Sequence, residues 1–359
     1  MRPQTLSVFL DYKCNYSCGH CSVGSSPETK FEMSEAYLDQ VFEQARSIPS
    51  LEVVVFTGGE VTLHWETLLE AISRASQDGY MTRIVTNAWW AYDLEHTREG
   101  LDELLDAGLD EISTSYDDYH TDFCDPEPIL NLIEVGTQTE GLKNLSVATV
   151  VGDEDPTYDK AKMKELVSDR LGCPPSEFPE GLVLIEDKAS PMGRGAQLDV
   201  SNVDPAESLL NGCKDVINTI SVHPDGSVKA CCGHAQWYVP DLTLGSLDEE
   251  TLPEIVDRSS QNLVYWLVHQ LGPKRILQEL GIEKHHSGIC HACYDLLGNH
   301  REEFLEFVRD DREAIRRLLI TEGGFKQDIE AITEKREEII EALRAAEDVG
   351  PGDLPKVMS

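Results

Sequence analysis

Three cysteines near the N-terminus have a spacing that suits iron–sulfur chemistry. Cys14, Cys18 and Cys21 form the pattern C-x3-C-x2-C in the segment CNYSCGHC, shortly after an apolar run at 5–10. Thiolates hold iron–sulfur clusters, and such short spacings let one loop wrap around a cluster. Three local ligands leave one iron without a protein ligand, which is what a catalytic metal centre needs. A zinc site or a chance grouping of thiols is the alternative.

Four further cysteines could close a second metal site. Cys213, Cys231, Cys290 and Cys293 follow the pattern C-x17-C, a long gap and C-x2-C. Four thiolates complete a coordination shell, and this ligand count fits a structural zinc as well as a 4Fe-4S cluster. Cys232 could replace Cys231 as a ligand or remain a free thiol, because adjacent cysteines cannot easily face the same cluster.

Strand and helix signals alternate through the first half of the chain. Short apolar runs predict six strands, at 5–10, 51–56, 82–87, 110–115, 144–151 and 181–186. Helical periodicity predicts helices at 34–46, 63–77, 97–107 and 160–170, with Ser34 as the first N-cap. This alternation is typical of a parallel sheet, either open or curled into a partial barrel. In both forms ligands bind at the C-terminal ends of the strands, where the three-cysteine loop lies.

The alternation stops near residue 198. The stretch TISVHPDGSVKACC predicts a strand pair joined by a turn at 224–227, which begins a smaller α+β unit. From 300 to about 346 the sequence is charged and helically periodic, and a loose tail follows. We therefore expect three parts, a barrel at 1–198, a cysteine-bearing unit at 199–298 and a helical segment with tail at 299–359.

The composition is that of an acidic globular protein. The 359 residues include 66 acidic and 30 basic side chains, which gives a formal charge of −36. Such a charge repels nucleic acids and anionic membranes. The sequence contains neither an apolar run of membrane-spanning length nor a secretory signal, so we expect a cytoplasmic protein. The acidic surface could serve solubility, also at high salt, or attract a basic peptide.

The cysteine loop resembles the signature of the radical S-adenosylmethionine (SAM) superfamily. In that family C-x3-C-x2-C follows the first strand of a partial (β/α)6 barrel of the TIM type, and the 4Fe-4S cluster held there binds SAM and cleaves it reductively. The segment FTGGE, with Gly58, Gly59 and Glu60, looks like the family's motif for the SAM amino group. His20 stands where the family usually has an aromatic residue near the adenine, although it could equally be an ordinary loop histidine.

The resemblance also implies roles for polar residues at other strand ends. Asn87, Ser113 and Ser115 would contact SAM, although each could equally serve a turn. Arg194, in the segment SPMGRG, would pair with a carboxylate of SAM or substrate, unless it forms a surface ion pair.

The second cysteine set resembles the auxiliary-cluster region called SPASM, or its shorter form, twitch. Full SPASM regions use about seven cysteines for two clusters, and this chain lacks the later run of cysteines. The resemblance therefore implies one auxiliary 4Fe-4S cluster, which would accept an electron from a substrate radical. A flavodoxin or ferredoxin-type protein would donate the electron that cleaves SAM.

The implied activity is that of an oxidoreductase that abstracts a hydrogen atom. We expect a ribosomally made peptide as substrate, modified by a crosslink, epimerisation or oxidation. One alternative is a dehydrogenase or rearrangement enzyme for a small molecule such as an aminocyclitol, and another is a non-catalytic iron–sulfur electron carrier. Asp117 and His120, in the segment SYDDYH, are candidate catalytic residues, or parts of an ordinary polar loop.

Overall fold

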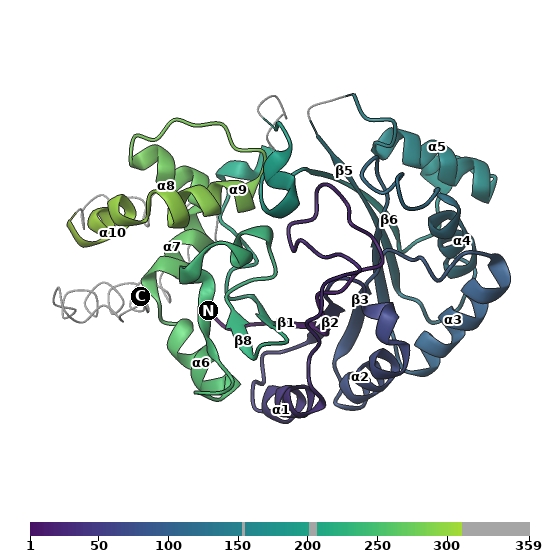
Figure 1. Ribbon diagram of the computed structural model, residues 1–359, viewed down its shortest axis with the longest axis horizontal. Coiled ribbons are helices and arrows are strands. Elements are labelled where there is room, and N and C mark those ends of the chain that lie inside the picture. Colours follow the sequence, from purple (N-terminus) through teal and green to yellow (C-terminus); the bar gives the residue numbers. More distant parts are fainter. Residues whose placement is uncertain (153–154, 201–206, 311–359) are drawn as a thin grey trace.

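A curved sheet of nine strands runs through the computed structural model, which describes residues 1–152, 155–200 and 207–310. The strands follow the order β6-β5-β4-β3-β2-β1-β7-β8-β9. The first six are parallel to one another. Figure 1 shows them as a curved wall with helices along its outer side. This arrangement confirms the predicted partial (β/α)6 barrel.

Six strands and five helices alternate in this barrel. The strands are β1 (Thr5–Phe9), β2 (Val53–Thr57), β3 (Met81–Val85), β4 (Glu111–Ser115), β5 (Asn144–Val151) and β6 (Leu182–Lys188). The helices are α1 (Glu35–Ala45), α2 (Trp65–Gln77), α3 (Leu94–Asp106), α4 (Glu127–Gly136) and α5 (Lys160–Leu171). All six predicted strands are confirmed, as are the four predicted helices.

Local sequence explains where several of these helices begin and end. The Ser34 hydroxyl accepts a hydrogen bond from the backbone N–H of Tyr37 at 3.2 Å, which confirms it as the N-cap of α1. Asp93 and Asp159 cap α3 and α5 in the same way. Helix α5 stops at Gly172, whose φ of 68° is left-handed and suits a residue without a side chain.

The two faces of the parallel sheet have different chemistry. Buried aliphatic and aromatic residues pack against the helices, among them Leu6, Val8, Val54, Phe56, Ile84, Ile112, Leu145 and Val147. Because successive side chains of a strand point to opposite faces, the residues between them face the concave side. That side carries serines such as Ser7, Ser113 and Ser146 beside aliphatic side chains such as Val55 and Val85.

Helix α4 is absent from the sequence-based prediction. Seven of its ten residues are buried, so the helix is covered on most of its surface. Its sequence is therefore close to a continuous apolar run, which a buried strand would also produce. The predicted helix at 63–77 also differs in detail, because a 3-10 turn at Val61–His64 precedes α2.

The C-terminal unit extends the barrel sheet. Its strands are β7 (Thr219–Val222), β8 (Ser227–Lys229) and β9 (Thr243–Ser246). Strand β7 pairs in parallel with β1, and β8 and β9 follow antiparallel. The predicted strand pair and its turn at 224–227 are thus confirmed. Its attachment to β1, which brings the two cysteine sets onto one sheet, is a contact that local sequence does not reveal.

Short helices complete the described C-terminal part. They are α6 (Leu252–Ser259), α7 (Leu263–Leu271), α8 (Pro273–Glu279), α9 (Ile289–Tyr294) and α10 (Arg301–Asp310). Helix α10 begins the helical segment predicted from 300, whereas the rest of that segment and the tail lie outside the described residues. Among the described helices, none has the length and apolar character needed to cross a bilayer.

Candidate active site

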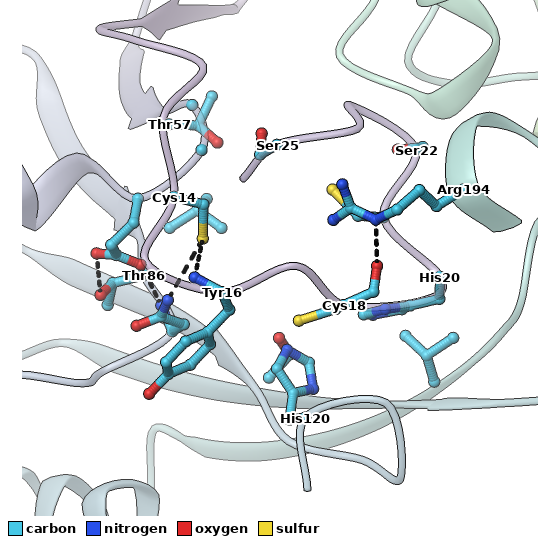
Figure 2. A pocket seen from close by; sticks show the side chains of 18 of the residues that line it. Cys14, Tyr16, Cys18, His20, Ser22, Ser25, Thr57, Thr86, His120 and Arg194 are labelled. Carbon is cyan, nitrogen blue, oxygen red and sulfur yellow. Dashed lines mark hydrogen bonds between the residues drawn. The ribbon is translucent and has the colours of Figure 1, made fainter. Parts of the chain in front are cut away.

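A cavity of about 230 Å³ opens at the C-terminal ends of the parallel strands. Its walls come from the loop after β1, from the ends of β2 to β6, and from a 3-10 turn at Gly193–Gln197 (Figure 2). Most of the predicted site residues line it, namely Cys14, Cys18, His20, Cys21, Gly58, Gly59, Glu60, Asn87, Ser115, His120 and Arg194. This position agrees with the rule that ligands bind at the C-terminal ends of the strands in parallel β/α barrels.

The three cysteines of the first loop face this cavity with free thiols. Cys14 and Cys18 are buried, and Figure 2 shows both on the loop that borders the cavity. Burial raises the pKa of Cys14 to about 12 and also raises the pKa of Cys18. Thiolates at such positions need a positive partner, so the donor set fits a bound iron–sulfur cluster.

Asn87 joins this loop to the sheet. Its side-chain amide donates to Oδ1 of Asn15 at 2.8 Å and approaches Sγ of Cys14 at 3.7 Å. Asn87 lies two residues beyond the end of β3, whereas the prediction placed it at the strand's last position. The extra two residues let its amide reach across to the cysteine loop.

The two glycines of the FTGGE segment pack against the backbone of the same loop. A Cβ atom on Gly58 would lie 2.4 Å from the carbonyl oxygen of Asp11, and one on Gly59 would lie 2.0 Å from that of Lys13. Neither position has room for a side chain. The two glycines therefore allow the end of β2 to pack directly against the backbone of the cysteine loop.

The Glu60 carboxylate is buried and engaged with donors of this chain. Its Oε1 accepts hydrogen bonds from the Thr62 hydroxyl at 2.6 Å and the Thr86 hydroxyl at 2.7 Å, and its Oε2 accepts one from the Asn87 N–H at 2.6 Å. Burial raises the pKa of Glu60, although these hydrogen bonds oppose the rise. The carboxylate thus holds the loop after β3 in place. This role is additional to the predicted contact with the SAM amino group.

Arg194 has a guanidinium nitrogen that remains for a ligand. Its Nε donates to the carbonyl oxygen of Cys18 at 2.9 Å, as Figure 2 shows, and its backbone N–H donates to Cys21. Its Nη2 is buried and has no hydrogen-bond partner within the described part of the chain. Because buried donors are normally satisfied, this orphaned N–H group fits an anionic ligand such as the SAM carboxylate.

Asp117 lies behind the cavity wall. Its side chain is fully buried, its Oδ1 accepts from His120 Nδ1 at 2.8 Å, and its Oδ2 is 3.7 Å from His20 Nε2. Burial alone would raise the pKa of Asp117, but the hydrogen bond and charge of His120 outweigh it and leave the pKa below its usual value. Of the two predicted catalytic residues, only His120 lines the cavity.

His20 presents a flat ring to the cavity. The ring stacks on Tyr119 with centroids 4.9 Å apart and planes 11° apart. Burial lowers the pKa of His20 to about 4, so the imidazole is neutral near pH 7. A neutral aromatic face at this point suits the predicted neighbour of an adenine ring.

The two serines predicted on β4 occupy different depths. Ser115, at the end of the strand, lines the cavity. Ser113 lies roughly 7 Å further down the strand, because each residue advances about 3.3 Å. There its hydroxyl accepts from Ser146 of β5 at 2.8 Å. Ser113 is not among the residues that line the cavity, so the cavity does not support its predicted contact with SAM.

Asp187 and His234 are two of the lining residues that the sequence-based prediction did not name. Asp187 lies at the end of β6, and His234 begins the 3-10 turn His234–Trp237 of the C-terminal unit. Burial lowers the pKa of His234, and the charge of Asp187 opposes this. The position of Asp187 near the end of a predicted strand is a signal that could have identified it, whereas no local signal marks His234.

The second cysteine set forms a group of free, largely buried thiols. Burial, together with the neighbouring Cys290, Cys293, Cys232 and Cys213 thiols, raises the pKa of Cys231 well above its usual value. A Cβ atom on Gly233 would lie 2.8 Å from Cys290 Sγ, so this glycine leaves room beside the sulfur atoms. A group of four neighbouring thiols fits a closed iron–sulfur site.

The adjacent Cys232 differs from this group in its surroundings. It is exposed, and its side chain forms a hydrogen bond with Ser7 on the concave face of β1. Cys231 is buried among the other three thiols. The geometry therefore favours Cys231 over Cys232 as the fourth member of the group.

Comparisons with known proteins match both parts of the chain. The family model of the radical SAM superfamily matches residues 10–148, and that of an iron–sulfur cluster-binding domain, SPASM, matches residues 213–294. A curated relative, the "Putative peptide biosynthesis protein YydG" of Bacillus subtilis (strain 168), is 24% identical over 311 residues. That alignment covers 83% of this chain and 93% of the relative.

Solved structures of similar proteins include BtrN in complex with AdoMet and 2-DOIA, which is 14% identical with a TM-score of 0.47. The match covers 81% of this chain and 92% of BtrN. Another is SuiB of Streptococcus suis bound to the precursor peptide SuiA, also 14% identical with a TM-score of 0.47. It covers 76% of this chain and 67% of SuiB.

The two family matches coincide with the two cysteine sets. A radical SAM domain binds a 4Fe-4S cluster and SAM, and a SPASM domain binds auxiliary iron–sulfur clusters. The free thiols of the first loop, the orphaned Arg194 nitrogen and the buried second set fit these groups. The chain therefore carries a radical SAM domain at 10–148 and a SPASM-type iron–sulfur cluster-binding domain at 213–294.

Proposed function

We propose that this protein modifies a ribosomally made peptide at the cavity described above. The observation that carries the peptide assignment is the relationship to YydG, named as a peptide biosynthesis protein, over 93% of that protein's length. When bound, the first cluster and SAM supply the one-electron cleavage of SAM and the abstraction of a hydrogen atom from the substrate. A flavodoxin or ferredoxin-type donor would supply the electron.

Cys14, Cys18 and Cys21 would hold the first cluster. They come from one loop and face one cavity, and the described residues that line this cavity include no fourth cysteine. Three thiolates leave one iron for SAM. Gly58 and Gly59 support this arrangement by letting β2 pack directly on the loop.

Arg194, Ser115 and the ring of His20 would bind SAM. The Arg194 guanidinium would pair with the carboxylate, since its Nη2 lies buried without a partner among the described residues. The His20 ring would pack near the adenine. Glu60 and Asn87 would fix the walls, because their side chains bind other parts of this chain.

His120 would exchange a proton with the substrate, and Asp117 would position it. A proton on Nδ1 of His120 donates to Asp117 Oδ1, which leaves Nε2 as the acceptor. The same carboxylate lies 3.7 Å from His20 Nε2, so one buried group is next to both rings. Asp117 is therefore proposed as a positioning residue rather than as a catalytic one.

Replacing Arg194 by alanine is expected to raise the Kd for SAM about ten- to a hundredfold. A charge-assisted hydrogen bond contributes roughly 1.5–3 kcal/mol, which corresponds to that range. Anaerobic equilibrium dialysis with labelled SAM measures the change. Arg46→Ala serves as the control, because Arg46 pairs with Asp78 on the surface. Equal SAM affinity in both variants would refute the assigned role of Arg194.

The second group, Cys213, Cys231, Cys290 and Cys293, would hold an auxiliary cluster that accepts an electron from the substrate. Cys231→Ala is expected to lose about four iron atoms per chain, whereas Cys232→Ala should keep the full iron content. Anaerobic reconstitution followed by iron and sulfide analysis compares the two variants. Iron loss in the Cys232 variant alone would instead identify Cys232, and not Cys231, as the cluster ligand.

The proposed roles follow the order of the chain. Residues 1–198 form the radical SAM core, residues 199–298 the auxiliary-cluster unit, and residues 299–359 a C-terminal segment without an assigned role. Because β7 pairs with β1, the second unit is anchored to the first strand of the core. This anchoring keeps His234 of the second unit at the cavity of the first.

A small-molecule dehydrogenase is the second candidate function. The two functions differ in substrate, so the test is to incubate the reconstituted protein with dithionite and SAM and with either an aminocyclitol or a peptide encoded beside the gene. Mass spectrometry of the peptide should reveal loss of two hydrogen atoms, because one hydrogen atom would be abstracted, one electron would pass to the auxiliary cluster and one proton to His120. Conversion of the aminocyclitol with an unchanged peptide would contradict the proposal.

A further inference from the structure

The turn at 233–238 packs against the second cysteine set at its start. Gly233 lies so close to this set that a Cβ atom on it would be 2.8 Å from Cys290 Sγ. The backbone N–H groups of the next two residues, His234 and Ala235, donate hydrogen bonds to the Cys290 thiol. Hydrogen bonds to the sulfur atoms of an iron–sulfur cluster help to set its reduction potential. The position of this turn would therefore influence the auxiliary cluster.

The end of the same turn is bound to the first cysteine loop. The Tyr238 hydroxyl donates a hydrogen bond to the carbonyl oxygen of Ser22 at 2.5 Å. Ser22 follows Cys21 directly in the chain and lines the cavity. The contact joins residues 216 positions apart, so it ties the loop of the first site to the turn of the second. A displacement of the loop would move the turn as well.

A buried hydrogen-bond network holds the middle of the turn to the same loop. The Tyr12 hydroxyl is hydrogen-bonded to His223 Nδ1 at 2.8 Å, and His223 Nε2 lies 3.0 Å from Oε1 of Gln236 in the turn. The neighbouring Trp237 packs edge-on against the Tyr12 ring, with centroids 5.2 Å apart. Tyr12 lies two residues before Cys14. The turn is therefore attached to the first loop both before and after its three cysteines.

Between these contacts the turn forms part of the cavity wall. The His234 side chain lines the cavity, whereas the backbone N–H of the same residue donates to Cys290. One residue thus touches both the space for SAM and a sulfur atom of the second set. A ligand in the cavity would contact the side chain whose backbone binds this sulfur atom.

We propose that the turn at 233–238 couples the two cluster sites, so that SAM bound at the first site changes the reduction potential of the auxiliary cluster. SAM would contact His234 and the loop that holds Ser22, and the turn would carry the change to the N–H···S hydrogen bonds at Cys290. Coupling between two binding sites is reciprocal and amounts to about 5- to 150-fold in affinity. The inference needs both clusters but no particular substrate, so it goes beyond the proposed peptide modification.

The test is a redox titration of the anaerobically reconstituted full chain, followed by electron paramagnetic resonance, with and without saturating S-adenosylhomocysteine. This analogue lacks the sulfonium charge that reductive cleavage of SAM requires. The variant with Cys14, Cys18 and Cys21 replaced by alanine identifies the signal of the auxiliary cluster. We expect the analogue to change the equilibrium constant for reduction of this cluster about tenfold, which is a shift of about 59 mV for a one-electron couple.

Tyr238→Phe removes only the hydroxyl that binds Ser22, and it is expected to lose most of this shift. The Tyr238 side chain is partly exposed, so the fold should tolerate the change. Tyr92→Phe is the matched control, because Tyr92 is an exposed tyrosine before α3 that does not line the cavity. The control variant should show the same shift as the wild-type protein.

Binding of the analogue is verified in each protein by the change in the signal of the first cluster. A wild-type protein that binds the analogue without a shift in the auxiliary cluster overturns the inference, as does an unchanged shift in Tyr238→Phe. A Tyr238→Phe variant that no longer binds the analogue also overturns it, because Tyr238 would then serve SAM binding rather than coupling. A wild-type protein that does not bind the analogue contradicts the proposed function instead.

Discussion

A variant with Cys14, Cys18 and Cys21 all replaced by alanine is expected to form no detectable 5'-deoxyadenosine from SAM. It should also contain about four fewer iron atoms than the wild-type protein, because the loop that would hold the first cluster loses its thiolates. The fold should persist, since Cys14 and Cys18 belong to a small hydrophobic cluster separate from the main core. Chromatography of the reaction mixture, iron analysis and circular dichroism measure these three properties.

Cys173→Ala provides the control for this variant. Cys173 follows helix α5 on the outer side of the barrel and belongs to neither cysteine set. Its replacement should leave both iron content and SAM cleavage unchanged. Residual SAM cleavage by the triple variant at the wild-type rate would show that other residues hold the catalytic cluster.

The double variant Cys290→Ala/Cys293→Ala is expected to separate SAM cleavage from product formation. Without these thiolates the second group cannot hold a cluster, so the substrate radical would have no protein-bound acceptor for its electron. SAM cleavage should continue in part, because the residues of the first site are unchanged, whereas modified peptide should fall below detection. The ratio of product to 5'-deoxyadenosine measures this separation.

Both cysteines of this variant come from helix α9, so its folding needs a check. Retained cleavage of SAM in the absence of product is that check, since it requires an intact barrel. Normal amounts of modified peptide would show that the second group is not the electron acceptor. The cluster held by the second cysteine group would then have a structural role only.

The barrel could be predicted from sequence because its strands are short apolar runs separated by capped helices. The run at 51–56 is an example, since β2 spans Val53–Thr57 and its central residues are buried. Helix α4 could not be predicted in the same way. Its burial on most sides removes the alternation between apolar and polar residues that distinguishes a helix from a strand.

Site residues that are close together in the sequence could be predicted from their spacing. Site residues that reach the cavity only through long-range contacts could not. Cys14, Cys18 and Cys21 lie within eight residues of one another, so spacing alone indicated their chemistry. The approach of His234 to the cavity depends on the pairing of β7 with β1, which joins residues far apart in the chain.

The same limit applies to side-chain networks inside the site. The Glu60 carboxylate binds Thr86 and the N–H of Asn87, which lie on the next strand's loop. Asp117 is fully buried, hydrogen-bonded to His120, and does not line the cavity. Strand-end position placed both carboxylates near the cavity, but only the packed structure determines which way each one points.

The central claim is that the first cysteine loop leaves one iron open to SAM. The most direct test is to record the electron paramagnetic resonance spectrum of the reduced, anaerobically reconstituted Cys290→Ala/Cys293→Ala variant while SAM is added. We expect the signal of the remaining cluster to change and to saturate at one SAM per chain. A spectrum that SAM does not alter would show that this cluster has no open iron, and it would contradict the account.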